Sequence, residues 1–287
     1  MKKTLAALVT ALTISIGGCN IQPGEYYPIE QKRKPVPEQS MGGLYENHNV
    51  SLKEGKLESL EKSVELLTVE STYCPVGKDG QCDTAKKNEK VKWWGSGTVV
   101  HQDSEYMYMI TAGHVAIPDA EIETMFGDKY KLVGEPRITI SSKNVAWEFM
   151  AGINDSTMDY AYLRTPKTDK LRVMDAKIGD SSQISIGDMI YVMGYPLTTG
   201  RTTSSGNISC IVQKDPEYLK DGKTNPQQFM FTSPISGGNS GGPIFTIRDG
   251  ELYLIGIAVA TWTRGQNLNI GVKISDIIRY TNANIKF

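Results

Sequence analysis

The hydrophobic residues of this chain fall in short runs that are separated by glycine, proline and aspartate. Such runs, alternating or continuously apolar and bounded by turn residues, are typical of β-strands. They lie at 64–72, 91–101, 106–110, 159–163, 189–193, 201–213, 228–232, 243–247, 252–261 and 267–273. Many short strands with few helical periods predict an all-β protein of the barrel type.

Two stretches at the ends of this region have helical spacing instead. Leu57 and Leu60 predict a short helix within residues 52–62. Ile274, Ile277 and Ile278 share one face of a second helix over 274–281. The strands therefore form the body of the fold, and the second helix is expected to close it.

Residues 1–18 have the composition of an export signal. Lys2 and Lys3 precede a short apolar run, and small residues lead to Cys19. The run is too short to cross a bilayer as a stable helix. Its end resembles the bacterial lipobox, which implies cleavage before Cys19 and lipid attachment to that residue. The alternative is an ordinary secretory signal in which Cys19 has no role.

Residues 19–51 are polar and contain four prolines with few aliphatic side chains. Such a segment buries too little apolar surface to fold, so it predicts a flexible tether. The tether would hold a folded domain of residues 52–287 at the membrane of a bacterial cell envelope. Asn20 after the lipidated cysteine favours the periplasmic face of the outer membrane in a Gram-negative host, since inner-membrane retention usually takes Asp.

The overall charge is nearly balanced, with 31 Lys and Arg against 32 Asp and Glu among 287 residues. The bulk electrostatics therefore give no reason to expect a nucleic-acid partner. Composition and charge do not predict an oligomeric state. A chain of this length has room for one large or two small domains, and nothing requires a second.

The cysteines of the folded part predict one disulfide. Cys74 and Cys82 close a turn rich in glycine, proline and aspartate. A metal site would need further Cys or His nearby, and none is present, so a disulfide in an exported protein is the better interpretation. Cys210 is left over and is expected to be a small buried residue of its strand.

The candidate chemistry centres on Ser240. Residues 236–243 spell Ser-Gly-Gly-Asn-Ser-Gly-Gly-Pro, which places a single hydroxyl between two glycine pairs. Glycine allows a tight turn, outward backbone N–H groups and close approach of another molecule. A serine nucleophile also needs a base and a carboxylate that orients the base. His114, directly after one predicted strand, and Asp159, at the start of another, supply them.

Other histidines and carboxylates fit these roles less well. His48 lies in the tether, and His101 lies at a strand edge where a structural role is more common. Asp128 and Asp155 lie in turn-like sequences. Only Asp159 directly precedes alternating apolar residues, where its carboxylate would be largely buried.

Three of these stretches together resemble the catalytic blocks of trypsin-like serine proteases of the chymotrypsin fold. They are Thr-Ala-Gly-His at 111–114, Asp-Tyr-Ala-Tyr-Leu at 159–163 and Gly-Asn-Ser-Gly-Gly-Pro at 238–243. Ile-Gly-Asp at 186–188, leading to Gly-Tyr-Pro at 194–196, is similar to the bacterial HtrA/Deg branch. The resemblance covers roughly residues 62–280.

The resemblance implies two six-stranded antiparallel β-barrels at about 62–164 and 171–273, followed by the closing helix. It also implies a serine endopeptidase that acts on proteins or peptides without a cofactor or metal. In that reading His114, Asp159 and Ser240 are the catalytic triad. The N–H groups of Gly238 and Ser240 would form the oxyanion hole. We expect no PDZ segment after the closing helix, in contrast to HtrA enzymes that carry one.

The substrate pocket of the family is lined by the residues before the serine block and by the strand after it. No carboxylate occurs in either stretch here, which disfavours a preference for Lys or Arg and favours a small or medium apolar side chain. The residues concerned are Pro234, Ile235, Ser236, Ala258, Val259, Ala260 and Thr261.

Asn239 adds an expectation about activation. In digestive trypsin-like enzymes an Asp at this position pairs with an amino terminus released by cleavage. Asn239 has no charge for such a pair, and the amino terminus here would be acylated and remote. We therefore expect no activation by that route.

Two alternatives compete with the protease reading. One is a catalytically silent protease fold that serves as a binding or scaffold module at the membrane surface. The other is an esterase of the α/β-hydrolase type, which needs Gly-x-Ser-x-Gly and the chain order Ser, Asp, His. The chain order here is His, Asp, Ser, which is the reverse of that order. The esterase is therefore rejected, whereas the silent module requires an experiment.

Overall fold

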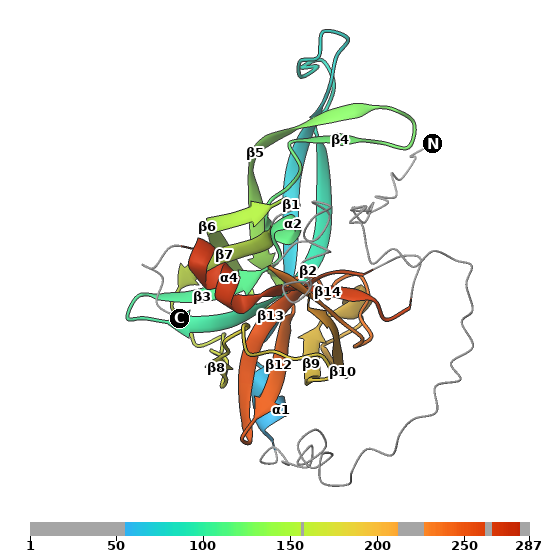
Figure 1. Ribbon diagram of the computed structural model, residues 1–287. Coiled ribbons are helices and arrows are strands. Elements are labelled where there is room, and N and C mark those ends of the chain that lie inside the picture. Colours follow the sequence, from blue (N-terminus) through green and yellow to red (C-terminus); the bar gives the residue numbers. More distant parts are fainter. Residues whose placement is uncertain (1–54, 156–157, 212–226, 262–265, 282–287) are drawn as a thin grey trace, which may run out of the picture.

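The computed structural model describes residues 55–155, 158–211, 227–261 and 266–281 (Figure 1). The predicted signal at 1–18 and the whole predicted tether at 19–51, including Cys19, lie outside these ranges. Within them the chain is mostly strand, with short helices. No helix of the described part is long and apolar enough to cross a membrane.

The N-terminal half forms a closed barrel. Its strands follow the order β1-β2-β3-β7-β6-β5, and β5 pairs back with β1 to close the ring, while β4 is added at the edge of β5. The strands are β1 (Val64–Pro75), β2 (Glu89–Gln102), β3 (Tyr106–Thr111), β4 (Glu121–Glu123), β5 (Lys129–Ile140), β6 (Val145–Asn154) and β7 (Asp159–Pro166).

The C-terminal half forms a second closed barrel. The order is β12-β9-β10-β11-β14-β13, closed by pairing of β12 with β13, and β8 lies parallel to β13. The strands are β8 (Lys177–Ile178), β9 (Met189–Gly194), β10 (Thr202–Ile211), β11 (Gln228–Phe231), β12 (Pro243–Arg248), β13 (Glu251–Thr261) and β14 (Asn269–Lys273). The predicted all-β class with two six-stranded antiparallel barrels is confirmed.

Short helices complete the described chain. The expected first helix is α1 (Lys56–Glu61), and the expected closing helix is α4 (Ile274–Tyr280). The single turn α2 (Gly113–Ala116) follows β3, and two 3-10 turns lie between strands, η2 (Ser141–Lys143) and η3 (Pro196–Thr198).

One apolar core joins the two barrels. Val99 and Ile110 of the first barrel belong to the same buried cluster as Met193, Phe245 and Ile257 of the second. In the first part of β3, Met107 and Met109 are buried, whereas Tyr106 and Tyr108 between them are half-buried, as the two-residue period of a strand requires. Because burial of apolar surface stabilises both halves at once, the barrels are held against each other along this cluster.

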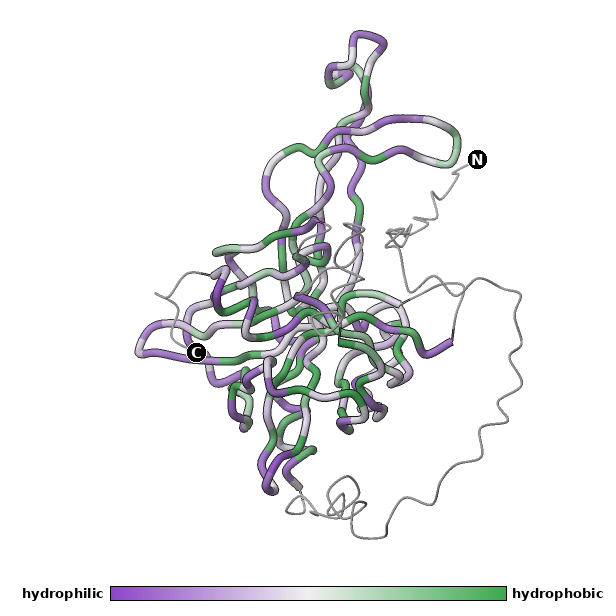
Figure 2. Tube along the Cα trace, viewed as in Figure 1, coloured by the Kyte–Doolittle hydropathy of each residue, from purple (hydrophilic) through white to green (hydrophobic). Residues whose placement is uncertain are grey.

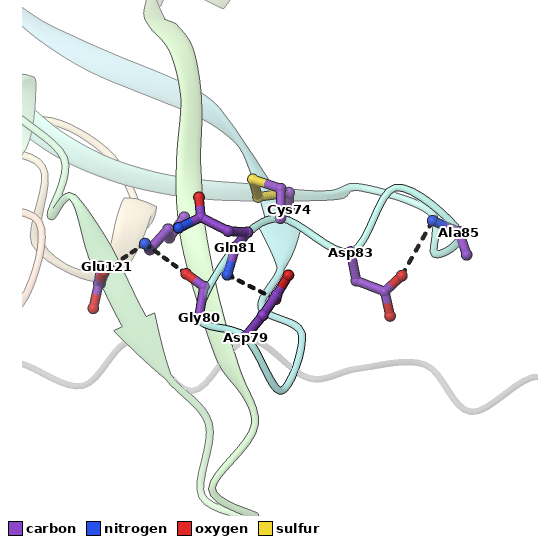
Figure 3. The surroundings of a disulfide bond; sticks show 9 residues. Cys74, Asp79, Gly80, Gln81, Asp83, Ala85 and Glu121 are labelled. Carbon is purple, nitrogen blue, oxygen red and sulfur yellow. Dashed lines mark hydrogen bonds and ion pairs between the residues drawn. A yellow bond between two sulfur atoms is a disulfide. The ribbon is translucent and has the colours of Figure 1, made fainter.

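Part of the first barrel continues as an arm. Figure 1 shows β1, β2, β4 and β5 running past the barrel, and Figure 2 shows largely hydrophilic residues at its tip. The predicted disulfide between Cys74 and Cys82 is present there, with a Cα–Cα distance of 5.5 Å (Figure 3). Lys131 also ties the tip to β5, because its Nζ donates to the Gly80 carbonyl at 2.8 Å.

Cys210 departs from the expectation. It lies in β10 but is only half-buried. The pairing of β10 with β11 shifts register between Ile208 and Cys210, and such a bulge re-aims the side chain that follows it.

Candidate active site

The structure brings His114 and Asp159 into direct contact. His114 lies in α2, three residues after the end of β3, and Asp159 is the first residue of β7. β3 and β7 are neighbours, with Thr111 opposite Ala161, so the two residues meet at the same end of the pair. The His114 Nδ1 and Asp159 Oδ2 atoms are 2.7 Å apart, and the His114 backbone N–H donates to Asp159 Oδ1 at 2.9 Å.

Close packing beneath His114 fixes this contact. A Cβ at Gly113 would lie 2.0 Å from the Ile153 carbonyl oxygen and 2.9 Å from Asp159 Oδ1. Only glycine therefore fits before His114. The Asp159 side chain is 9% exposed, whereas the His114 side chain is 32% exposed, so the carboxylate is buried while the ring is partly open to solvent.

The loop that carries Ser240 comes from the other barrel and docks onto the first. The Ser96 N–H donates to the Ser240 carbonyl at 2.7 Å. A Cβ at Gly241 would lie 2.1 Å from Thr111 Oγ1 and 2.6 Å from the Ala112 nitrogen, and its φ of 82° also favours glycine. The loop thus contacts the segment that leads into His114.

The hydrogen bond expected between the Ser240 hydroxyl and the His114 ring is not formed in this structure. Among the described residues, the His114 ring hydrogen-bonds only to Asp159, and the Ser240 hydroxyl has no hydrogen bond to the ring. Catalytic hydrogen bonds of ligand-free enzymes are often long and tighten when substrate binds. The described contacts therefore join His114 to Asp159 and dock the serine loop on the same barrel, without a hydrogen bond from Ser240 to the ring.

The electrostatics around His114 favour its charged form. Burial lowers the His114 pKa, but the nearby Asp159 charge, the hydrogen bond to Asp159 and the Asp119 charge raise it, and the net pKa shift is upward. An imidazole with a raised pKa accepts a proton more readily. This is the property that a general base beside a serine requires.

The backbone N–H groups of Gly238 and Ser240 are available to a ligand. Neither donates a hydrogen bond to another group in the part of the chain that the structure describes. Gly238 has a φ of 98°, and a Cβ there would lie 2.3 Å from the Tyr195 carbonyl oxygen. The Gly237 carbonyl accepts from the Leu197 N–H at 2.7 Å, and because this peptide is planar and trans, its Gly238 N–H points in the opposite direction.

The predicted pocket residues lie on both sides of the serine loop. Two hydrogen bonds join this loop to β13, from the Gly241 N–H to the Ala258 carbonyl at 2.7 Å and from the Ala258 N–H to the Gly242 carbonyl at 2.8 Å. Ala258 and Val259 are buried, Ile235 and Ala260 are half-buried, and Pro234, Ser236 and Thr261 are exposed.

The sequence did not indicate Asn269, which is buried and donates to the Ser233 carbonyl at 2.6 Å.

The rival residues lie elsewhere. His101 stacks on Tyr108, with ring centroids 5.7 Å apart, and Asp128 and Asp155 are exposed in turns. None of the three contacts His114 through a hydrogen bond. In the described ranges, no group of three or more His, Cys, Asp or Glu side chains could hold a metal ion.

Comparison with known proteins defines the class. The family model for the trypsin-like peptidase domain matches residues 95–257, and the chain belongs to this family. It is 26% identical over 183 residues to protease Do-like 14 of Arabidopsis thaliana, covering 64% of this chain and 39% of that protein. It is also 26% identical over 189 residues to the serine protease HtrA-like of Staphylococcus aureus strain USA300, covering 64% of this chain and 22% of the relative.

Solved structures agree on the fold. The HtrA-type protease AlgW with decapeptide superposes with a TM-score of 0.51 at 17% identity, over 79% of this chain and 65% of that one. The serine endoprotease from Yersinia pestis gives 0.50 at 17% identity, over 78% and 63%. These structures share the two-barrel fold of the chain. The chain spans less than half the length of the two curated relatives.

The His114–Asp159 contact predicts a titration that NMR can follow. The chain has three histidines, so the ring signals of labelled protein are readily assigned. In the wild type, His114 should titrate above the ordinary value of about 6.5. Asp159→Asn removes the charge that raises the pKa, and burial then lowers the midpoint. Asp128→Asn, an exposed carboxylate, is the control and should leave the midpoint in place. An unchanged midpoint in Asp159→Asn would contradict the assignment.

Proposed function

We propose that this protein is a serine endopeptidase that cleaves protein or peptide substrates through Ser240, His114 and Asp159. The observation that carries the proposal is the contact of His114 with buried Asp159, next to a serine loop docked from the opposite barrel. Membership of the trypsin-like peptidase family supports it.

The proposed reaction begins with attack of Ser240 Oγ on the peptide carbonyl. His114 Nε2 takes the hydroxyl proton and later gives it to the leaving amine, which leaves an acyl-enzyme. Asp159, bonded to Nδ1, keeps the ring in the tautomer whose Nε2 accepts a proton, and it stabilises the imidazolium. Water then attacks the acyl-enzyme by the same proton route.

The N–H groups of Gly238 and Ser240 would bind the oxyanion that forms in each step. They are not engaged by other described protein groups, so no hydrogen bond within the described part of the protein has to break before they donate. Loss of one such donor in related chemistry costs roughly 3 kcal/mol of transition-state stabilisation. The glycine at position 238 is therefore part of the proposed site through its backbone.

A fluorophosphonate probe tests the proposal directly. The wild type should be labelled and should hydrolyse an unfolded general protease substrate, because the activated Ser240 oxygen attacks phosphorus as it attacks a carbonyl. Ser240→Ala should abolish both signals, since it removes the attacking oxygen. The matched control is Ser104→Ala, an exposed serine in the turn between β2 and β3, which should remain labelled. A folded wild type that is neither labelled nor active would identify the silent binding module instead.

We further propose a preference for small or medium apolar side chains at the residue before the cleaved bond. The stretches 234–236 and 258–261 contain no carboxylate, and Ala258 and Val259 are buried beside the serine loop. A cationic side chain would find no opposite charge in these stretches, and burying it unpaired is costly.

Cleavage mapping on a peptide library tests this preference. Mass spectrometry of the products should give mostly Ala, Val or similar residues before the cleaved bond, with Lys and Arg rare. Dominant cleavage after Lys or Arg by the wild type would refute the preference.

We also propose that the chain is lipid-anchored in a bacterial cell envelope through Cys19, with residues 19–51 as a tether. The support is the signal-like sequence of residues 1–18, which ends in small residues before the cysteine. Several acyl chains give stable anchoring where a single one is marginal.

Metabolic labelling with palmitate in a bacterial host tests the anchor. The wild type should be labelled and should remain with membranes after a high-salt wash. Cys19→Ser should lose the label and remain uncleaved or become soluble, whereas Cys210→Ser, a cysteine of the folded part, should behave as the wild type. Palmitate label that persists in Cys19→Ser would refute lipid attachment at Cys19.

A further inference from the structure

Ser96 links the two barrels at the serine loop. It lies in β2 between two glycines, has no solvent exposure, and hydrogen-bonds through its backbone and its side chain. Its backbone N–H donates to the Ser240 carbonyl at 2.7 Å, and its own carbonyl accepts from Thr111 Oγ1 at 2.6 Å. Its backbone thus lies between the serine loop and the segment that leads to His114.

The Ser96 hydroxyl makes two more hydrogen bonds, both to the opposite barrel. It donates to the Gly238 carbonyl at 2.7 Å and accepts from the Tyr195 N–H at 2.9 Å. A serine hydroxyl has one proton to donate, so this geometry uses its only donor on Gly238. No other side chain of the described ranges has a hydrogen bond to the Gly238 carbonyl.

The glycines beside Ser96 permit this approach. A Cβ at Gly95 would lie 2.5 Å from a Val115 methyl carbon and 3.1 Å from the Ser240 carbonyl oxygen. A Cβ at Gly97 would lie 2.6 Å from the Met109 sulfur. Larger residues at either position would push β2 away from the serine loop and lengthen the Ser96 bonds.

The position of Gly238 depends on such contacts, because glycine has little conformational preference of its own. The peptide plane before Gly238 is held by the Leu197 N–H, which donates to the Gly237 carbonyl. The plane after it is held by the Ser96 hydroxyl. With both planes fixed, the Gly238 N–H points in one direction.

We propose that the Ser96 hydroxyl is a positioning residue for the oxyanion hole, acting through the Gly238 carbonyl. The inference rests on the proposed protease function and adds how that site is held in its working form. The link uses neutral groups within the folded domain. It therefore forms without a released amino terminus, in accord with the uncharged Asn239 that follows Gly238.

The test compares Ser96→Ala with a matched control. Ser63→Ala also removes the hydroxyl of a fully buried serine, one that donates to the Leu60 carbonyl at 2.6 Å and has no bond to the serine loop. A general loss of packing or stability should affect both variants alike. An effect through the oxyanion hole should appear only in Ser96→Ala.

Three quantities are measured for each variant: kcat, KM and the inhibition constant of a peptidyl boronic acid. Ser240 Oγ adds to boron, its proton passes to His114, and an anionic boronate oxygen occupies the oxyanion hole. We expect Ser96→Ala to lower kcat by about 10- to 100-fold, less than the roughly 100- to 1000-fold loss when a donor is removed outright. Boronate affinity should fall in parallel, with KM within about 2-fold.

The inference is overturned if folded Ser96→Ala keeps the kcat and boronate affinity of the wild type, if the loss appears in KM alone, or if Ser63→Ala loses as much. Crystal structures of the wild type and Ser96→Ala give a readout that needs no activity. A rotated or multiply placed Gly238–Asn239 peptide, with the Gly238 N–H displaced, supports the inference, and an unchanged Gly238 conformation overturns it. Failure of the proposed function is recognised separately, as a wild type that does not react with fluorophosphonate.

Discussion

The arrangement of this protein depends on the close contact between the serine loop of one barrel and strands β2 and β3 of the other. The contact has no room for side chains at Gly241 or Gly95, where a Cβ would meet neighbouring atoms at 2.1 Å and 2.5 Å. Because atoms at this density leave little freedom to shift, the loop has one position against the first barrel. That position places Ser240 beside the segment that carries His114.

The proposed triad is divided between the barrels, and this division links stability to chemistry. His114 and Asp159 belong to one closed sheet, and Ser240 belongs to the other. The shared apolar cluster and the Ser96 hydrogen bonds fix the position of one barrel relative to the other. A change that loosens the interface therefore affects the reaction even when every catalytic side chain remains.

The sequence predicted the strands with clear apolar patterns, such as β3 and β12, and it predicted the residues of contiguous motifs. It did not indicate β5 and β6, in which many side chains are exposed or half-buried and no apolar alternation stands out. It also did not indicate the role of Ser96, whose partner Gly238 lies 142 residues away. Local patterns reveal elements and motifs, whereas contacts between distant segments arise only from packing.

The central claim is that folding places Ser240 next to the His114–Asp159 pair in one working site. The most direct measurement is a crystal structure of the protein after reaction with a peptidyl chloromethyl ketone. The account predicts a single inhibitor molecule bonded to both Ser240 Oγ and His114 Nε2, with its oxygen against the N–H groups of Gly238 and Ser240. An inhibitor bound at another place, with His114 and Ser240 unmodified and facing apart, would contradict it.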